Sequence, residues 1–365
     1  MPLLRLLCLA LMLAVPTIGA AQKIPEKPYE VIRLAEGVYA LQWKDPVQSP
    51  VEGNSLFIIN DRDVVVVDAG YLPVTARRMA RALKQLTSKP VRYVINTHWH
   101  DDHHNGNQVY RDLWPAVEFI AHRDTRVDMY EGTYNVRAQD VANLRSGAER
   151  YRRWASTGKD DEGKPLEPRR QARAAELAGL LAAMAPEIAS VRTTPPDLTF
   201  DDQIVLHRGD RTIEIRWLGR GNTRGDVVVF LPRERIVASG DLVVQPVPFA
   251  FGSYYEDWIG TLGRLDSLEA DVIVPGHGGV QRDRTYLRQV QGLLRSLVDQ
   301  VKAQVAAGAT LEETRAKVTL AEWRDRFAGD NPRLQESFQT NFVNPAVERA
   351  WRQAKGEPDA LKGVE

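Results

Sequence analysis

Short runs of β-branched and other apolar residues recur along the first third of the chain. Turn residues such as Asn60-Asp61 separate these runs, and this pattern is typical of buried β-strands. We therefore predict strands at Val31–Leu34, Val38–Gln42, Leu56–Ile59, Val64–Val67, Val91–Ile95 and Val117–Ala121. Between the fourth and fifth strands, Pro73 begins a predicted helix that runs through Thr87, with Met79 and Leu83 on one face.

Residues from about 124 to 195 have a different pattern, rich in Arg, Ala and Glu. Leu177, Leu180 and Met184 follow helical spacing, so we interpret this segment as a helical insertion. Strands then resume, and we predict them at Ile204–Leu206, Ile213–Leu218, Val227–Leu231, Ile236–Ala238 and Val272–Val274. The two strand-rich halves are compatible with a sandwich of two sheets with helices outside.

The chain from Arg284 onward is predicted to be helical. An apolar stripe at helical spacing runs through Tyr286, Val290, Leu293, Leu294, Leu297, Val301 and Val305. Thr310 and Glu313 form a capping box for the following helix. The expected organisation is a leader at 1–21, a main domain at 22–283 that carries the insertion, and a helical C-terminal extension at 284–365.

Composition adds that the chain is an ordinary globular protein, with 43% hydrophobic residues. Lys+Arg and Asp+Glu both number 48, so the formal net charge is zero. The chain has no excess of basic residues, so its composition does not indicate a nucleic-acid partner. The expected partner is a small-molecule substrate, while the oligomeric state cannot be predicted from the sequence.

The first twenty-one residues resemble a secretory signal peptide. Arg5 precedes the apolar run Leu6–Val15, and the small residues Gly19, Ala20 and Ala21 follow Pro16. The alternative is an uncleaved membrane anchor, but the run is shorter than the roughly 20 apolar residues of a spanning helix. We expect cleavage after Ala20 or Ala21, a periplasmic or secreted location, and no membrane span in the mature chain.

Residues that can bind a metal ion are concentrated in one short segment. Four of the seven histidines lie between His98 and His104, where the ligand pattern is His-x-His-x-Asp-His. In an extended segment residues two apart point the same way, so His98 and His100 can converge on one ion. Asp102 and His103 follow where the chain turns toward a helix and can face a second position. The only cysteine, Cys8, lies in the leader, so imidazole and carboxylate ligands remain, and these suit zinc.

Other polar residues follow predicted strands in the same way. Asp68, Asn222, Asp241 and His277 each come after an apolar run. Because ligands of α/β proteins bind beyond the carboxyl ends of strands, we expect these residues to gather at one edge. Taken singly, Asp68 and Asp241 could instead be turn residues beside Gly70 and Gly240.

These motifs together resemble the metallo-β-lactamase superfamily. The resemblance rests on the run His98 to His103 and on Val67-Asp68-Ala69-Gly70, Ser239-Gly240-Asp241 and Pro275-Gly276-His277-Gly278. It implies an αββα sandwich. It also implies that His98 and His100 bind a first zinc, that Asp102, His103 and His277 bind a second, that Asp241 bridges both, and that Asp68 supports the ligands from behind.

One position departs from the family pattern. The family has Gly-His-Thr-x-Gly-Asp where this chain has Gly221-Asn222-Thr223-Arg224-Gly225-Asp226. Asn222 thus stands where the resemblance implies the third histidine of the first site. Because an amide oxygen is a poorer zinc ligand than imidazole, we expect one or two zinc ions per chain, with the first site weakened.

The remaining candidates lie near the cluster. His104 is interpreted as a packing or supporting residue, His122 as structural and His207 as exposed, while Trp99 lies between two ligands and packs under the site or lines its mouth. An aromatic stretch follows Asp241, and within it we predict that Tyr254 or Tyr255 contacts substrate because loops at this edge shape pockets.

The resulting prediction is an exported zinc-dependent hydrolase. Water activated by zinc attacks an ester, thioester, lactone or β-lactam carbonyl, with Asp102 orienting the water and accepting its proton. Asp241 in place of Cys or Ser resembles thioesterase, lactonase and sulfatase members more than true β-lactamases. Two alternatives stay open: a non-catalytic or weakly active metal-binding protein, which Asn222 favours, and a di-iron redox protein, whose usual flavin domain is not evident.

Overall fold

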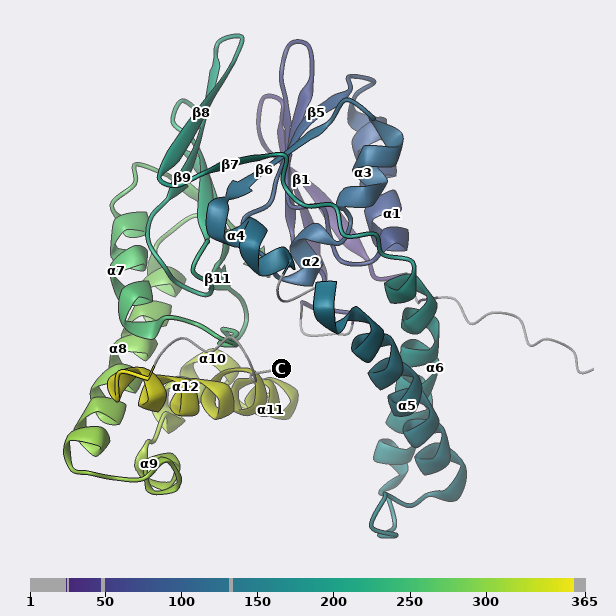
Figure 1. The fold of residues 1–365 in the computed structure, drawn as a ribbon, viewed down its shortest axis with the longest axis vertical. Coiled ribbons are helices and arrows are strands. Elements are labelled where there is room, and N and C mark those ends of the chain that lie inside the picture. Colours follow the sequence, from purple (N-terminus) through teal and green to yellow (C-terminus); the bar gives the residue numbers. More distant parts are fainter. Residues whose placement is uncertain (1–23, 25, 47–49, 131–133, 358–365) are drawn as a thin grey trace, which may run out of the picture. The chain divides into compact units, whose positions relative to one another are not determined.

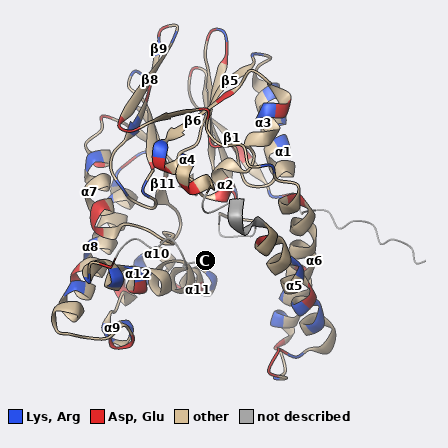
Figure 2. Cartoon of the chain, viewed as in Figure 1, with Lys and Arg blue, Asp and Glu red and all other residues tan. Residues whose placement is uncertain are grey.

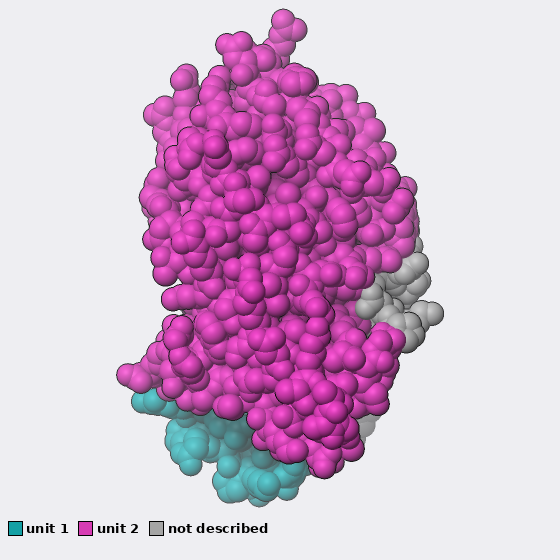
Figure 3. Space-filling view, turned by 90° about the vertical axis from the view of Figure 1, so that its left-hand side faces the viewer, with its two compact units in different colours: residues 1–25, 144–184 teal, residues 26–143, 185–365 magenta. Residues whose placement is uncertain are grey.

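The computed structural model describes residues 24, 26–46, 50–130 and 134–357 of the 365-residue chain. The chain divides into two compact units, one of residues 1–25 with 144–184 and one of residues 26–143 with 185–365 (Figure 3). The predicted signal peptide lies outside the described residues. Both sheets and every candidate site residue belong to the second unit.

The first sheet of the second unit has seven strands in the order β1-β2-β3-β4-β5-β6-β7. The strands are β1 (Tyr29–Ala35), β2 (Val38–Trp43), β3 (Ser55–Ile59), β4 (Val64–Val67), β5 (Val91–Ile95), β6 (Glu118–His122) and β7 (Leu198–Phe200). Strands β1 to β4 pair antiparallel, and β4 to β7 pair parallel. The sequence pattern predicts all of these strands except β7, which has only three residues.

The second sheet has five strands in the order β12-β11-β10-β9-β8. The strands are β8 (Gln203–Arg208), β9 (Arg211–Trp217), β10 (Val227–Leu231), β11 (Ile236–Val244) and β12 (Val272–His277). Strands β11 and β12 pair parallel and are longer than predicted, because they include the polar residues Asp241 and His277. The register of this pair shifts between Ala238 and Gly240, which is a local bulge beside Asp241.

The sheets and helices form an αββα sandwich, as the resemblance implied (Figure 1). Apolar side chains of both sheets form one shared cluster between them, with Val67, Ile95 and Val274 among its members. A second cluster joins the first sheet to α1 (Pro73–Leu86) and α3 (Asn107–Leu113). A third joins the second sheet to α7 (Tyr255–Asp266) and α8 (Thr285–Ala306). Each sheet is therefore covered by helices on its outer face.

The helical segments occur where the pattern predicted them. Helices α4 (Arg123–Asp128), α5 (Tyr134–Thr157) and α6 (Pro168–Ala189) lie between β6 and β7. In the first unit, the Gln171 side chain donates a hydrogen bond to the carbonyl of Ala155 and so ties α6 to α5. The small buried residues of this helix pair include Ala148, Ala174 and Ala178.

The C-terminal region continues with α9 (Leu311–Lys317), α10 (Ala321–Ala328), α11 (Pro332–Phe338), the π-helical turn η2 (Gln339–Val343) and α12 (Asn344–Ala354). The predicted stripe of α8 is buried against these helices and α7. Thr310 and Glu313 form the predicted capping box, in which each side chain accepts a hydrogen bond from the other residue's backbone N–H. Basic and acidic residues are interspersed along α7, α8 and α12 (Figure 2). None of the helices in the described ranges has a stretch that is both long and apolar enough to cross a bilayer.

Candidate metal centre

Six predicted ligands converge at one edge of the two sheets. His98 and His100 lie in the segment after β5, and Asp102 and His103 lie in the short helix α2 (Asp101–His104). Asp241 lies within β11, and His277 is the last residue of β12. Their ligand atoms form two groups, His98 with His100 and Asp241, and Asp102 with His103 and His277, each within 4.8 Å.

The first group contains two imidazoles in close contact. Nε2 of His98 lies 2.9 Å from Nδ1 of His100. Oδ2 of Asp241 is 3.6 Å from Nε2 of His98 and 3.9 Å from Nδ1 of His100. The other ring nitrogen of His98, Nδ1, is hydrogen-bonded to the hydroxyl of Thr97 at 3.0 Å. Nε2 is therefore the atom of His98 that faces the other ligands of the first group.

The second group is more tightly convergent. Nε2 of His103 lies 3.3 Å from Nε2 of His277, and Oδ2 of Asp102 is 3.0 Å from the same His277 atom. Oδ1 of Asp241 lies 3.3 Å from His103 and 3.5 Å from His277. Asp241 thus directs one carboxylate oxygen at each group, which is the geometry of a bridging ligand.

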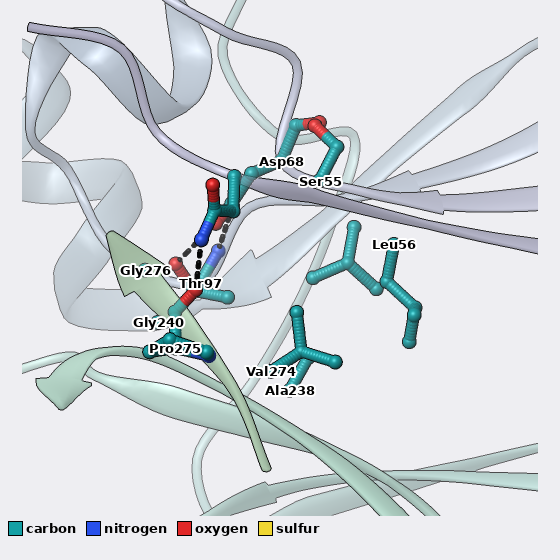
Figure 4. A pocket seen from close by; sticks show the side chains of 11 residues that line it. Ser55, Leu56, Asp68, Thr97, Ala238, Gly240, Val274, Pro275 and Gly276 are labelled. Atoms are coloured by element: carbon teal, nitrogen blue, oxygen red, sulfur yellow. Dashed lines mark hydrogen bonds between the residues drawn. The ribbon is translucent and has the colours of Figure 1, made fainter. Parts of the chain in front are cut away.

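Asp68 supports the cluster from behind. It adopts a left-handed backbone conformation, with φ of 59°. Its carboxylate accepts hydrogen bonds from the backbone N–H and the hydroxyl of Thr97, both at 2.8 Å, and lies 2.7 Å from Nδ1 of His103. A small cavity lined by residues of both sheets adjoins this network (Figure 4). Because Asp68 contacts Nδ1 of His103, the other ring nitrogen, Nε2, faces the metal position.

Two glycines allow the chain to approach the ligands closely. A Cβ atom on Gly276 would lie 1.9 Å from Oδ1 of Asp241, and one on Gly53 would lie 2.6 Å from the ring of His103. Neither residue has a positive φ, so the requirement is for space and not for backbone conformation. Gly276 belongs to a motif that the sequence singled out, whereas Gly53 carried no recognisable sequence signal.

The charges of the cluster keep its carboxylates ionised. Burial by itself raises the pKa of Asp241, but the charges of His277, His103 and His98 outweigh it and hold that pKa well below the usual range. Asp102 is affected in the same way, with His103 as its largest opposing charge. Burial opposes protonation of His277, yet the neighbouring carboxylates raise its pKa to about 9.

Asn222 lies beside the first group, but its amide is already engaged. It is fully buried, and its oxygen accepts a hydrogen bond from the hydroxyl of Ser253 at 3.1 Å. Its Nδ2 donates to the backbone carbonyl of Asp241 at 3.3 Å. Ser253 was not predicted from the sequence, because its contact with Asn222 joins positions 31 residues apart.

The tyrosines predicted to contact substrate are buried in the structure. Tyr255 is 0% exposed, belongs to the core between the second sheet and the helices, and donates its hydroxyl to the carbonyl of Ala250. Tyr254 is also buried, with the guanidinium groups of Arg220 and Arg349 at 4.5 and 5.4 Å from its ring centre. Their burial corrects the prediction, since the apolar core and the cation–π contacts already surround these rings.

The other histidines lie as the sequence suggested. His122 is buried, stacks on Trp217 with ring centres 5.3 Å apart, and caps α4 by accepting a hydrogen bond from the N–H of Asp124. His104 is buried 3.6 Å from Asp101, and His207 is exposed on β8. Trp99 is half-buried, with its ring edge-on to His100 at 4.9 Å.

The donor set fits a transition-metal ion such as zinc. Four imidazoles and two carboxylates converge, and Oδ1 of Asp241 is buried without a hydrogen bond from any residue that the structure describes. Buried lone pairs that face each other at these distances require a cation or protons between them. His98, His100 and Asp241 would hold one ion, and Asp102, His103, His277 and Asp241 would hold another.

An αββα sandwich with such a cluster at the edge of its sheets defines a class of metal-binding proteins. Residues 49–277 match the family model of the metallo-beta-lactamase superfamily. The chain belongs to this superfamily.

Individual proteins that the chain resembles include an alkylsulfatase and a metallo-beta-lactamase. It is 26% identical over 298 residues to a linear primary-alkylsulfatase of Pseudomonas sp. (strain ATCC 19151), and the match covers 76% of this chain and 51% of the relative. The chain therefore spans about half the length of this curated relative. Among solved structures, a stereoselective inverting sec-alkylsulfatase from Pseudomonas sp. has a TM-score of 0.61 at 17% identity, over 91% of this chain and 51% of that one. A metallo-beta-lactamase from Pontibacter korlensis has a TM-score of 0.52 at 18% identity, over 73% and 99% of the two chains.

Proposed function

We propose that this protein is a zinc-dependent hydrolase of small ester substrates, with sulfate esters as the first class to test. The observation that carries the proposal is the convergence of six histidine and aspartate ligands, with Asp241 directed at both groups. The alkylsulfatase relative supports the sulfate-ester class. Carboxylic esters, thioesters, lactones and β-lactams remain the other substrates that such a site could hydrolyse.

The residues of this chain have separate tasks in the proposed reaction. Zinc, when bound, would supply a Lewis acid that lowers the pKa of water to about 7. Asp102 is ionised and its side chain is 18% exposed, so it can accept a hydrogen bond from water and orient it. We assign the same carboxylate as the acceptor of the water's proton. Asp68 keeps His103 oriented, and Asp241 holds the two ligand groups together. Hydrolysis then separates the ester into an alcohol and an acid.

The proposal is tested by zinc content and turnover measured together. Purified protein is assayed against sulfate esters, carboxylic esters, lactones and β-lactams, together with His103→Ala and the exposed-histidine control His207→Ala. We expect His103→Ala to lose most bound zinc and all activity, and His207→Ala to keep both. Full zinc content and turnover in His103→Ala would show that the ligand assignment is wrong.

A second function is favoured by one observation. Asn222 replaces a first-site ligand and is engaged by Ser253, which suits a metal-binding protein with little or no catalysis. Stoichiometric zinc without turnover on the whole substrate panel would support this second function over the first.

A further inference from the structure

Ser253 lies between the metal centre and the C-terminal extension. It is fully buried, and its hydroxyl is hydrogen-bonded to Oδ1 of Asn222 at 3.1 Å, while Nδ2 of Asn222 donates to the carbonyl of Asp241 at 3.3 Å. A carbonyl oxygen can only accept, so the nitrogen of the amide must face Asp241 and its oxygen must face Ser253. The hydroxyl of Ser253 is therefore the donor. Asn222 cannot turn its oxygen toward the metal ligands without losing both hydrogen bonds.

The segment that carries Ser253 is fixed from two sides. Nε2 of Gln353 and Nε of Arg349, both on α12, donate to the carbonyl of Ser253 at 2.8 and 3.5 Å. The next residue, Tyr254, donates its N–H to the carbonyl of Gly221 at 2.8 Å. Because the match to the superfamily model ends at residue 277, these contacts connect the metal centre to a helix outside the matched span.

We propose that Ser253 is a positioning residue that keeps the oxygen of Asn222 away from the first metal position, and that α12 holds Ser253 in place for this task. The inference rests on the metal binding of the proposed function but not on its hydrolysis. Without the hydroxyl, the buried amide oxygen loses its donor, and an unsatisfied buried acceptor is costly. The oxygen regains a partner by turning to bind a zinc ion at His98, His100 and Asp241. The hydroxyl thus weakens the first site of the natural protein.

The main test is zinc affinity, measured by calorimetry and by competition with a chelator. Ser253→Ala should tighten the weaker of the two zinc-binding events about fivefold, which corresponds to one ordinary hydrogen bond. Gln353→Ala loosens Ser253 without removing its hydroxyl and should tighten the same event about twofold. A serine with only a structural role would give the opposite sign, because a looser site binds metal more weakly. The control is Ser337→Ala, which removes a buried hydroxyl of α11 that accepts a hydrogen bond from Asn341 at 2.9 Å and should leave both events unchanged.

A double variant identifies the atom that is responsible. Asn222→Ala combined with Ser253→Ala has no amide oxygen to release, so its first-site affinity should equal that of Asn222→Ala alone. A gain in affinity that persists in the double variant would overturn the proposal. An unchanged or weaker first site in both Ser253→Ala and Gln353→Ala would overturn it as well.

Ester turnover, measured on the same samples, separates this inference from the proposed function. If no ester is hydrolysed but Ser253→Ala still tightens zinc binding, the positioning role stands and the proposed function fails. If esters are hydrolysed but neither Ser253→Ala nor Gln353→Ala binds zinc more tightly than the natural protein, the proposed function stands and the positioning role is wrong. A natural protein that binds no zinc would overturn both.

Discussion

Single residues beside the metal centre determine which ring nitrogen of a neighbouring histidine is free to bind a metal. Asp68 engages Thr97 and one nitrogen of His103, and so determines which nitrogen of that ring faces the metal position. Thr97 does the same for His98. Neither residue needs to touch a metal, yet each determines the direction of a ligand.

Asn222 leads to a prediction about zinc stoichiometry. His98, His100 and Asp241 are the strong ligands of the first group, and the amide oxygen of Asn222 already accepts a hydrogen bond from Ser253. We expect about one zinc ion at limiting metal, rising toward two with excess, because the second group has the fuller set of good ligands. Asn222→His should add a second tight binding event in calorimetry.

The control for this prediction is Asn222→Ala, which removes the amide without adding a nitrogen and should keep one tight event. Two zinc ions bound with equal, tight affinity by the natural protein would contradict the prediction. So would an Asn222→His variant whose first-site affinity is unchanged.

Glu52 leads to a prediction about pH and stability. Glu52 is fully buried and lies in the segment that connects β2 to β3. Burial raises its pKa to about 8, although the N–H of Tyr71 opposes this by donating a hydrogen bond to the carboxylate. The folded protein therefore keeps this proton up to about pH 8, whereas the unfolded chain loses it near the ordinary value of 4.5. Since the folded state binds more protons in this window, its stability should fall as pH rises from 4.5 to 8.

The measurement is the free energy of unfolding in urea at pH 5, 6, 7 and 8, on metal-free protein. Glu52→Gln matches the protonated side chain in shape and cannot titrate. Relative to this variant, the natural protein should lose up to about 1.4 kcal/mol per pH unit. Parallel pH profiles of the two proteins would rule out the assigned role of Glu52.

At the scale of elements, strands β11 and β12 bring together ligands that lie 36 positions apart in the chain, Asp241 and His277. Gly276 in β12 allows this, because no side chain fits between it and Asp241. We predict that Gly276→Ala displaces the carboxylate of Asp241 and reduces zinc affinity at least tenfold, measured by competition with a chelator.

Gly279→Ala is the matched control for this variant. A Cβ atom there would meet only the side-chain oxygen of Gln245, at 3.6 Å, which is ordinary contact. Its zinc affinity should stay within twofold of the natural protein. Equal zinc affinity in both variants would mean that the close approach at Gly276 is not needed to place Asp241.

At the scale of the whole molecule, the prediction concerns export. Arg5, the apolar run Leu6–Val15 and the small residues before Gln22 motivate it. Periplasmic protein should begin at Ala21 or Gln22 when its N-terminus is determined by mass spectrometry. Leu11→Arg, which places a charge inside the apolar run, should leave the chain unprocessed. Mature periplasmic protein that begins at Met1 would refute the prediction.

The sequence alone determined most strands, the main helices and the ligand-bearing segment His98–His103. These features depend on local periodicity and on residues that are neighbours in the chain, and both are readable without a fold. The strands Val91–Ile95 and Val227–Leu231 match the observed β5 and β10. Asp241 and His277 each follow an apolar run, so the pattern placed them at the same edge, and the family resemblance added their roles as ligands.

Only the tertiary structure decided which residues far apart in the chain contact one another and which of them are buried. It placed Tyr255 in the core, engaged Asn222 with Ser253, and positioned Phe249 beside His277. The aromatic residues that follow Asp241 resemble one another in type but differ in exposure, because burial depends on which elements pack against each side chain. Such contacts join residues far apart in the chain, and no local pattern encodes which of them will meet.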